Sequence, residues 1–526
     1  MFLIMSGAYV GTELESEFGH IPPSFLPLGN RRLFQHQVAL APHGAEVYFS
    51  TPESFTISEH DREWLQNHKV NILAIPDGLS LGASLVAAVN ISGHSLDTPL
   101  HVLYGDTLFS HLYEGDDIAS VSEAKDSYNW AILTDDKAHW LKDNDLANNR
   151  RNQIIDGYFK FSQPRELLRC ITQSEWSFIE GLNRYHISVG LTPVESCGWL
   201  DFGHVNTYYR SKAEHTTQRA FNELTINSRW IEKASVKNDK IAAEAHWFAT
   251  LPDQLRGYIP QYLGSNTEKG KVCYRLEYLH LTALNELFVF AQLPSKVWQQ
   301  ILMGCIEFLQ QCTQHNANAS VTTNGLDVLF GDKTYQRLEE FFNSESISLD
   351  TKWQFDDQPI TLRQVLNKST QHLPSGREKM SVLHGDFCFS NILYDFRAGK
   401  VKTIDPRGMT PDGKKTLYGD ISYDLAKLSH SILGLYDWII AGYYDVNIEG
   451  NRIELNIANS GQHKETQQAF IELVEQNFTL TAKNLYAMQI QLFLSMLPLH
   501  ADDKNRQKAL FANAFRLYQI LQRLEQ

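Results

Sequence analysis

The sequence lacks the features that mark secreted and membrane-spanning proteins. Its six cysteines are scattered through 526 residues without a C-x-x-C pair, a pattern that gives neither a disulfide framework nor a zinc motif and that fits a reducing compartment. No apolar run approaches the roughly 20 residues of a membrane-spanning helix. The apolar start, residues 1–5, lacks the basic flank and the cleavage site of a signal peptide. We therefore expect a soluble, cytoplasmic protein without membrane insertion.

An excess of positive charge is also missing. Aspartate and glutamate number 61 against 47 lysines and arginines, which gives a formal net charge of −14 and a pI near 5.8. Proteins that bind nucleic acid through its phosphates need a basic surface, so this composition argues against a nucleic-acid partner. The chain is 43% hydrophobic and too long for one ordinary domain. We expect two or three domains, and the composition leaves the oligomeric state open.

The first part of the chain, residues 1–212, alternates short apolar strands with helical segments. Strands are expected at residues 2–5, 45–50, 70–75 and 101–104, and a helix is expected at 81–89. This alternation is typical of an α/β domain whose mostly parallel sheet carries helices on both faces. Ligands of such sheets bind beyond the carboxyl ends of the strands, and Asp106 follows one of these ends.

Four local matches make residues 1–212 similar to the sugar-phosphate nucleotidyltransferases. They are a glycine-bearing loop at 6–12, Leu-Pro-Leu-Gly at 26–29, Leu-Tyr-Gly-Asp at 103–106 and Gly-Trp-Leu-Asp-Phe-Gly at 198–203. The resemblance implies a nucleotide-diphospho-sugar transferase-like fold in which Asp106 and Asp201 hold Mg²⁺ on a second nucleoside triphosphate. Such a metal would bridge the triphosphate and the attacking sugar phosphate.

The same region departs from that family where a triphosphate needs cations. The basic residue that normally follows the glycine-bearing turn is replaced by Glu13, with Glu15 and Glu17 close behind. Arg31 and Arg32 are the substitutes that the sequence offers. A triphosphate without nearby cations is poorly stabilised. Two interpretations therefore stay open: an active nucleotidyltransferase domain, or a domain that scaffolds or recognises a nucleotide-sugar.

The densest group of chemically useful side chains lies between residues 381 and 408. Apolar runs surround the sequence His-Gly-Asp-x-x-x-x-Asn at 384–391 and the Ile-Asp-Pro that follows it. Phosphoryl transfer needs a carboxylate that orients and deprotonates a hydroxyl, and oxygen ligands for Mg²⁺ on the nucleotide. Asp386 supplies the first, and Asn391 and Asp405 supply the second. His-Gly-Asp alone is a common turn, but the whole combination is specific.

This set of residues resembles the aminoglycoside phosphotransferase and choline kinase branch of the protein-kinase-like fold. The resemblance implies a bilobal α+β domain over residues 213–526, with a small lobe over 213–290 and a large lobe over 291–526. It also implies ATP as co-substrate, Mg²⁺ as cofactor, and a bracing role for His384. A helical segment at 208–222 bridges the two domains without a Gly/Ser linker.

The ATP-binding residues follow from the same resemblance. Lys233, near the end of a strand, would contact the α- and β-phosphates, and Glu244 on the next helix would hold it by an ion pair. Backbone groups from Glu277 to Leu279 would read the adenine edge. A glycine-rich phosphate loop is missing, because residues 222–229 contain no glycine.

Several further residues near these motifs receive other interpretations. Asp420 would cap a helix, and Asp424 would pair with a base nearby. Arg407 has two open roles, contact with an anionic substrate or support of the loop. Residues 294–312 are amphipathic and predict the first long helix of the large lobe, and the polar segment 316–350 is a candidate lid.

Residues 1–212 and 213–526 therefore look like a fusion of a nucleotidyltransferase-like domain and a kinase-like domain. We expect an ATP-dependent phosphotransferase that acts on a hydroxyl of a small molecule, such as a sugar, a polyol or an amino alcohol. Nucleotidyl transfer to the phosphorylated product would then suit surface polysaccharide or capsule biosynthesis, by analogy alone. The alternatives are a monofunctional kinase with a degenerate first domain, or an inactive scaffold in capsule assembly.

Overall fold

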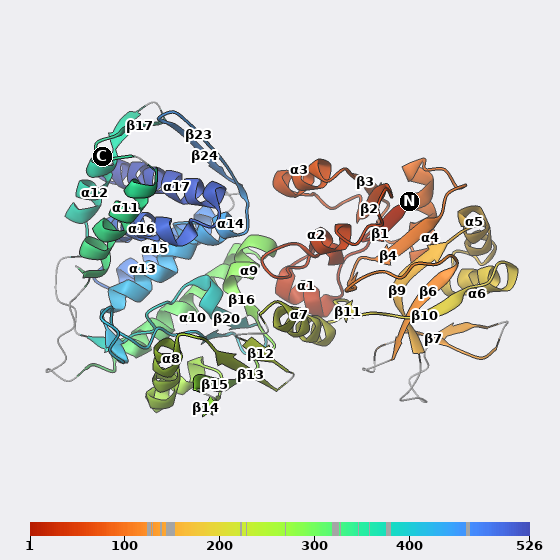
Figure 1. Cartoon of the computed structure of the whole chain (residues 1–526), viewed down its shortest axis with the longest axis horizontal. Helices are drawn as coiled ribbons and strands as arrows, with labels where there is room; N and C mark the ends of the chain where they lie inside the picture. Colours follow the sequence, from red (N-terminus) through yellow and green to blue (C-terminus); the bar gives the residue numbers. More distant parts are fainter. Residues whose placement is uncertain are drawn as a thin grey trace. The chain divides into compact units, whose positions relative to one another are not determined.

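The computed structural model in Figure 1 describes most of the chain. The described residues are 1–123, 128, 130–136, 139–143, 153–220, 224–227, 229–268, 270–317, 326, 328–345, 347–356, 358–374, 380–458 and 463–526. They form two units, one of Met1–Lys212 with Phe290–Gln292 and one of Ala213–Val289 with Leu293–Gln526. The division falls inside helix α7 (Val205–Ala220), which covers most of the segment expected to bridge the two domains.

The first unit is built on a nine-stranded sheet. Its main path runs β10-β6-β9-β4-β1-β2-β3, with β7 paired to β9 and β8 paired to β7. The strands are β1 (Phe2–Met5), β2 (Val47–Pro52), β3 (Val70–Ile75), β4 (Leu100–Tyr104), β6 (Ile118–Glu123), β7 (Ala131–Leu133), β8 (Leu141–Asp143), β9 (Gln153–Phe161) and β10 (Thr192–Glu195). The helices are α1 (Thr12–Phe18), η1 (Pro23–Phe25), α2 (Leu33–Val38), α3 (Glu59–Asn67), α4 (Leu81–Ser92), α5 (Pro164–Gln173) and α6 (Phe178–Ser188).

The strand directions correct one expectation. β1 pairs in parallel with β2 and β4, and β2 pairs in parallel with β3. β9 runs antiparallel to both β4 and β6. The prediction of a mostly parallel sheet is right up to Tyr104. Beyond it, β9 is antiparallel to its neighbours, whereas β10 pairs in parallel with β6. Along the described part of the chain no helix separates β4, β6 and β9, and parallel neighbours need a crossover connection that antiparallel ones do not.

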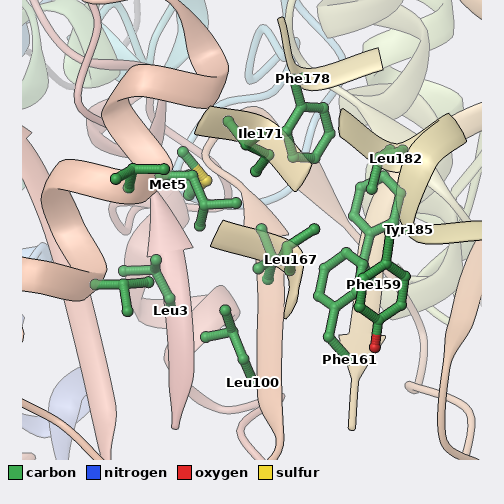
Figure 2. Packing of buried hydrophobic residues seen from close by; sticks show 14 of the residues in the cluster. Leu3, Met5, Leu100, Phe159, Phe161, Leu167, Ile171, Phe178, Leu182 and Tyr185 are labelled. Carbon is green, nitrogen blue, oxygen red and sulfur yellow. The ribbon is translucent and has the colours of Figure 1, made fainter. Parts of the chain in front are cut away.

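Helices cover both faces of this sheet, as expected. Side chains alternate along a strand, and Leu3 and Met5 of β1 point to the face that α4, α5 and α6 cover. There they belong to a buried cluster with Leu100, Phe159, Phe161, Leu167, Ile171, Phe178, Leu182 and Tyr185 (Figure 2). On the opposite face, Phe34 of α2 packs on Phe49 of β2 with ring centroids 5.7 Å apart.

The carboxyl end of β4 leads into the first candidate site. Gly105 and Asp106 form a turn, and the short strand β5 (Thr107–Leu108) then pairs antiparallel with β11 (Leu200–Asp201). The Phe202 backbone N–H donates to the Asp106 carbonyl oxygen at 2.8 Å. This pairing brings Asp106 and Asp201 together from positions almost a hundred residues apart in the sequence.

The second unit begins with an antiparallel sheet of order β12-β13-β15-β14. Its strands are β12 (Leu224–Ile226), β13 (Trp230–Ala234), β14 (Tyr262–Glu268) and β15 (Lys271–Glu277), and helix α8 (Asn238–Thr250) and the turn η2 (Asp253–Tyr258) lie between β13 and β14 in the chain. Two strands followed by a helix are what the sequence predicts here, and the structure confirms them.

Helices dominate the rest of the second unit. They are α9 (Leu284–Phe290), α10 (Ser295–Thr313), η3 (Val328–Asp332), α11 (Lys333–Glu345), α12 (Leu362–Gln371), η4 (Phe389–Asn391), α13 (Ile421–Ile432), α14 (Tyr436–Ile440), α15 (Lys464–Asn477), α16 (Ala482–Met496), η5 (Leu497–His500) and α17 (Lys504–Arg523). The long amphipathic helix predicted near 294–312 is α10. The candidate lid at 316–350 lies partly outside the described residues, and its remainder contains η3 and α11.

Short strands complete the second unit in three small sheets. They are β16 (Thr282–Ala283) with β20 (Ile392–Asp395) and β21 (Lys400–Thr403), β19 (Ser381–Val382) with β22 (Tyr418–Gly419), and β17 (Lys352–Phe355) with β18 (Gln358–Thr361), β23 (Tyr444–Glu449) and β24 (Arg452–Ile457). The loop at 384–391 therefore lies between β19 and β20. Within the described residues, no helix has both the length and the apolar character that a membrane span requires.

Candidate functional site

The loop at 384–391 is held from inside the second unit by a buried carboxylate. Asp424 of α13 is fully buried, and its two oxygens accept the backbone N–H groups of His384 at 2.7 Å and Gly385 at 2.8 Å. Burial raises the pKa of Asp424 to about 7, although these hydrogen bonds favour its charged form. Asp424 therefore pairs with backbone donors, whereas the sequence suggested a basic side chain.

His384 supports the loop and does not act as a base. Its Nε2–H donates to the Ile404 carbonyl oxygen at 2.9 Å, and its Nδ1 accepts the Asp386 backbone N–H at 3.3 Å. Burial lowers the pKa of His384 to about 4, so the imidazole is neutral near pH 7 and both of its nitrogens are occupied. The ring ties the loop to the segment that carries Asp405.

Asp386 projects from this loop between two polar side chains. Lys427 Nζ lies 2.9 Å from Asp386 Oδ1, and Asn391 Nδ2 donates to Asp386 Oδ2 at 3.2 Å. Burial opposes ionisation of Asp386, but Lys427 and Arg407 outweigh it and hold its pKa well below the ordinary range. Asp386 is therefore ionised and oriented near pH 7, and 39% of its side chain stays exposed.

Lys427 is a residue of this site that sequence reasoning missed. It lies on α13 one helical turn beyond Asp424, so both side chains face the same loop. An acid and a lysine three residues apart on a buried helix were the available signal. Spacing along one helix does not say which loop packs against it, so the signal was not sufficient.

Lys233 of β13 joins the small sheet to the segment after β21. Its Nζ lies 3.0 Å from Glu244 Oε2 on α8 and 3.0 Å from Asp405 Oδ1. Glu244 is buried and also accepts the Tyr274 hydroxyl at 2.8 Å. Burial lowers the pKa of Lys233, but Asp405 and Glu244 more than offset this and keep the ammonium charged. The ion pair with Glu244 is as the sequence suggested, and the contact with Asp405 is new.

The segment after β21 adopts a backbone conformation that depends on a glycine. Asp405 has a φ of +57° and Gly408 a φ of +64°, and the left-handed region costs a non-glycine residue about 1 kcal/mol or more. A Cβ on Gly408 would lie 2.4 Å from the Ala243 carbonyl oxygen of α8. This close approach couples the helix of Glu244 to the segment of Asp405. Strained backbone of this kind gathers at functional sites.

Asn391 and Asp405 offer oxygen atoms from adjoining segments. The Ile404 backbone N–H donates to the Asn391 carbonyl oxygen at 3.0 Å. Asn391 Nδ2 donates to Asp386, and the side-chain oxygen of Asn391 has no hydrogen bond among the described residues. The Asp405 side chain is 44% exposed. An amide oxygen and an open carboxylate suit Mg²⁺, which takes few protein ligands and completes its shell with phosphates and water.

Some backbone groups in the segment predicted to contact adenine already form hydrogen bonds with other parts of the backbone. The backbone N–H of Glu277 donates to the Gln261 carbonyl oxygen at 2.9 Å. The backbone N–H of Tyr278 donates to the Arg229 carbonyl oxygen at 3.0 Å. Leu279, between β15 and β16, makes no backbone hydrogen bond within the part of the chain that the structure describes. Leu279 therefore keeps its backbone groups available to a ligand, whereas the N–H of Glu277 is used.

A small pocket of about 50 Å³ adjoins the loop, with Arg407, Gly385, Thr410 and Tyr423 in its lining. The Arg407 backbone N–H donates to the His384 carbonyl oxygen at 2.8 Å, while its guanidinium carbon lies 5.5 Å from the Tyr423 ring centroid. The backbone of Arg407 therefore supports the loop, which was one of its two open roles. Its guanidinium stands at the pocket.

In the first unit, Asp106 and Asp201 meet around a glycine. A Cβ on Gly203 would lie 2.6 Å from Asp106 Oδ2 and 3.3 Å from Asp201 Oδ1, so the glycine leaves that space open. The Gly203 N–H donates to Asp201 Oδ1 at 3.0 Å, and Asp201 Oδ2 is buried without a hydrogen-bond partner among the described residues. Burial and the neighbouring Asp201 raise the pKa of Asp106 to about 7. Two adjacent acids with an unused oxygen suit a divalent cation.

The structure places Arg31 and Arg32, the substitute cations proposed for a triphosphate in the first unit, in different environments. Arg32 is buried, its Nε lies 3.4 Å from Asp61 Oδ2, and its Nη1 donates to the Phe25 carbonyl oxygen at 2.9 Å. Its guanidinium is thus part of the core, and the suggestion that it grips a triphosphate is wrong. Arg31 is exposed. Glu13, Glu15 and Glu17 lie on α1, and the guanidinium of Arg32 is therefore not available to offset their charge.

Comparison with known proteins assigns part of the second unit to a family. Residues 231–441 match the model for the phosphotransferase enzyme family, APH. A domain of that family therefore occupies this part of the chain, and it contains Lys233, Glu244, Asp386, Asn391 and Asp405. None of the curated proteins matches the chain.

Several solved structures are similar to parts of the chain. A thermostable mutant of aminoglycoside phosphotransferase APH(4)-Ia, in its apo form, is 13% identical with a TM-score of 0.36, over 57% of this chain and 89% of that one. The inositol-1-phosphate CTP transferase from T. maritima is 14% identical with a TM-score of 0.31, over 41% and 95%. HddC from Yersinia pseudotuberculosis is 17% identical with a TM-score of 0.32, over 40% and 98%. At these values the likenesses assign no activity to the chain.

Proposed function

We propose that residues 213–526 form an ATP-dependent kinase that phosphorylates a hydroxyl group of a small molecule, such as a sugar, a polyol or an amino alcohol. The observation that carries this proposal is the joint placement of Asp386 on its braced loop and of Lys233 between Glu244 and Asp405. Phosphoryl transfer depends mainly on positioning and on charge stabilisation, and these residues supply both. The family match over residues 231–441 supports the same class of reaction.

Asp386 acts on the acceptor in this proposal. The acceptor oxygen bonds to the γ-phosphorus, the bond from that phosphorus to ADP breaks, and the hydroxyl proton passes to Asp386. Lys427 and Asn391 fix the orientation of the carboxylate. Because its pKa is low, Asp386 is a weak base towards a free alcohol. It therefore takes the proton late, when bond formation has made the hydroxyl acidic.

Lys233 and Leu279 bind the nucleotide in this proposal. Lys233 contacts the α- and β-phosphates, and the free backbone groups of Leu279 contact the adenine edge. Glu244 and Asp405 hold Lys233 before any nucleotide arrives, so binding requires little reorganisation of the site.

Asn391 and Asp405 would hold Mg²⁺, for which their free amide oxygen and open carboxylate are suited. Bound there, the ion would neutralise charge on the phosphate oxygens. Among the described residues no three His, Cys, Asp or Glu side chains converge. The remaining ligands must therefore come from the nucleotide and water, which is usual for Mg²⁺.

The kinase proposal is tested by ADP formation with a panel of sugars, polyols and amino alcohols. The wild-type protein with Mg-ATP should turn over at least one acceptor, and Asp386→Asn should lower kcat by about 10³-fold while leaving ATP affinity unchanged. Asp445→Asn changes an exposed carboxylate on β23 and is the matched control, with the wild-type kcat expected. Equal ADP formation by wild type and Asp386→Asn with every acceptor would contradict the proposal and favour the inactive scaffold.

A second function is favoured by the adjacent carboxylates of the first unit. Asp106 and Asp201 would hold Mg²⁺ on a second nucleoside triphosphate, and the space beside Gly203 and the unused Asp201 oxygen fit such an ion. The phosphorylated product would attack the α-phosphorus, and pyrophosphate would leave. The test is pyrophosphate release from CTP, UTP, dTTP or GTP with candidate phosphates, which Asp201→Asn should abolish. No release with any nucleotide favours a monofunctional kinase with a recognition domain.

A kinase joined to a nucleotidyltransferase would make an activated sugar or alcohol in two consecutive steps. Assembly of a surface polysaccharide, including a capsule, consumes building blocks of this kind. We therefore place the two proposed activities in such a pathway. The placement rests on analogy with other fused enzymes, and the acceptor screen and the pyrophosphate assay together supply the product whose structure would support or reject it.

A further inference from the structure

Basic side chains gather around Tyr423 of α13, beside the loop of Asp386. The guanidinium carbon of Arg407 lies 5.5 Å from the Tyr423 ring centroid, and its Nη1 donates to the Tyr423 hydroxyl at 3.4 Å. Lys427, one helical turn after Tyr423, lies 2.9 Å from Asp386. Two cations therefore act on Tyr423. Lys427 is paired with Asp386, and Arg407 lines the pocket.

Helix α11 adds two further cations to the same place. Phe330, in the turn η3 that leads into α11, packs on Tyr423 with ring centroids 5.8 Å apart. Lys333 and Arg337 follow Phe330 at a spacing that keeps them on one side of the helix, and both interact electrostatically with Tyr423. Two basic side chains of the candidate lid segment therefore lie close enough to Tyr423 to interact with it electrostatically.

Three of these cations lack an acidic partner. Among the described residues, no carboxylate oxygen lies at ion-pair distance from Lys333, Arg337 or Arg407. Arg337 Nη1 donates to the Ser495 carbonyl oxygen at 2.9 Å, and the Lys333 ammonium makes no hydrogen bond within that part of the chain. Burial lowers the pKa of both Lys333 and Arg337, and the nearby Arg407 lowers it further. Tyr423, and for Arg337 also Glu340, offset only part of this lowering.

The acidic groups nearby are already committed. Asp386 is paired with Lys427, and the Asp424 oxygens accept two backbone N–H groups. Asp420 lines the pocket, where its carboxylate caps α13 by accepting the Ser422 N–H at 2.9 Å. Glu340, on α11, is exposed. Asp386 and Asp424 act electrostatically on Arg407, and Glu340 acts on Arg337, but none of these acids forms an ion pair with Lys333, Arg337 or Arg407.

The hydroxyl of Tyr423 reports the resulting positive potential. Burial alone would raise its pKa, yet Arg407, Lys427 and Lys333 together outweigh the burial and leave the pKa below its ordinary value. The same cations would stabilise an anionic group of a ligand placed beside the ring.

We propose that the acceptor of the kinase is itself an anion, a hydroxyl compound that also carries a phosphate or a carboxylate group, and that Lys333, Arg337 and Arg407 bind this group. The inference rests on the proposed kinase function of residues 213–526. A guanidinium offers a fork of donors that matches both kinds of anion. The same three cations disfavour an acceptor that carries an ammonium group, because its charge would be repelled.

A first experiment compares acceptors that differ in charge. ADP formation by the full chain with Mg-ATP is measured for glucose, glucose 6-phosphate, gluconate and glucosamine, and for glycerol, glycerol 3-phosphate and glycerate. We expect kcat/KM to be about tenfold or more higher for an anionic member than for its neutral partner, the gain of one charge-assisted contact. A preference for the neutral or amine member would overturn the inference while leaving the kinase proposal intact.

A second experiment does not require the acceptor. Inorganic phosphate is titrated into the full chain saturated with Mg²⁺ and a non-hydrolysable ATP analogue, with chloride at equal ionic strength as reference, and the heat of binding is measured. Phosphate should bind, and Lys333→Met or Arg337→Met should weaken it about tenfold. Lys508→Met, an exposed lysine of α17, is the matched control and should change nothing.

The affinity for the ATP analogue, measured in the same samples, distinguishes failure of the anionic-acceptor proposal from failure of the kinase proposal. Wild type and all three variants should bind the analogue equally, because none of these lysines and arginines contacts the nucleotide in the proposed site. Binding of the analogue without binding of phosphate, or phosphate binding that Lys333→Met leaves unchanged, would overturn the anionic acceptor alone. Failure of the wild-type protein to bind the analogue would contradict the kinase proposal itself.

Discussion

The two units place pairs of acids in opposite electrostatic settings. In the second unit, Asp386 lies 2.9 Å from Lys427, and Asp405 lies 3.0 Å from Lys233. In the first unit, Asp106 and Asp201 face each other, and neither forms an ion pair among the described residues. His204 and Arg210 act on Asp201 but do not outweigh its burial. Burial and the neighbouring Asp201 raise the pKa of Asp106 to about 7.

The two sites therefore differ in what each requires before it can act. A carboxylate with its own cation is ionised before any ligand arrives. A buried pair of carboxylates without one holds a proton or recruits a metal ion. The second unit therefore keeps its charged geometry in the absence of ligand, whereas the first unit depends on a cation from solution.

Removal of Lys233 should give the largest effect. Lys233→Met leaves Glu244 buried and Asp405 unpaired, so we expect kcat/KM for ATP to fall by about 10²- to 10³-fold, measured as ADP formation at a saturating acceptor concentration. Lys240→Met is the control, because Lys240 also lies near Glu244, at 3.7 Å, but is 56% exposed. Its loss should stay below about threefold, as for surface ion pairs. Equal losses in both variants would contradict a specific role for Lys233.

The residues of the candidate site in the second unit differ in how well the sequence alone predicts them. Asp386, Asn391 and Asp405 lie within 20 residues of one another, and a local spacing is enough to predict them. Lys233 and Glu244 are predictable because a strand followed by a helix fixes their order. Lys427 contacts Asp386 only because α13 packs against the loop, and Lys333 acts on Tyr423 only because Phe330, just before α11, packs on that ring. Such packing is decided by contacts between segments distant in sequence.

The sheet of the first unit shows the same limit. Apolar runs and turn residues located β1, β3 and β4 to within a residue, because the hydrophobic pattern of a strand is local. The antiparallel direction of β9 was missed, because the pattern of a strand does not encode its direction. Resemblance to a family implied that Asp106 and Asp201 meet, but the pairing of β11 with β5 that brings them together was not predicted.

A pH-dependent change in stability should come next in size. Since the pKa of Asp106 in the folded protein, about 7, lies above its ordinary value of 3.8, the folded state keeps a proton that the unfolded chain loses. Stability of the first unit therefore falls as the pH rises from about 4 to about 7. Asp106→Asn removes this loss, and we expect a gain of about 2 kcal/mol at pH 8 in EDTA and a smaller gain at pH 5.

Hydrogen-exchange protection of the β1 and β4 amides measures this change within the first unit, because it reports local stability even when other parts of a chain unfold separately. Protection of α16, in the second unit, is the internal control and should not respond to Asp106→Asn. A gain of equal size at both pH values would show that the two acids are not coupled through charge, and the contrast between the units would then lose its basis.

The smallest effect concerns Mg²⁺ and distinguishes the two settings most directly. Mg²⁺ alone should stabilise the first unit by about 1 kcal/mol at a few times its Kd, because neither Asp106 nor Asp201 forms an ion pair within the part of the chain that the structure describes, and Asp201→Asn should remove the effect. In the second unit Asp405 already has Lys233, so exchange in α8 and β13 should slow only when Mg²⁺ is added together with an ATP analogue, whose phosphates bring the missing negative charge. Slower exchange in α8 with Mg²⁺ alone would mean that Asp405 binds the metal without help from the nucleotide. The nearby Lys233, 3.0 Å away, would then not by itself decide when this carboxylate accepts a metal.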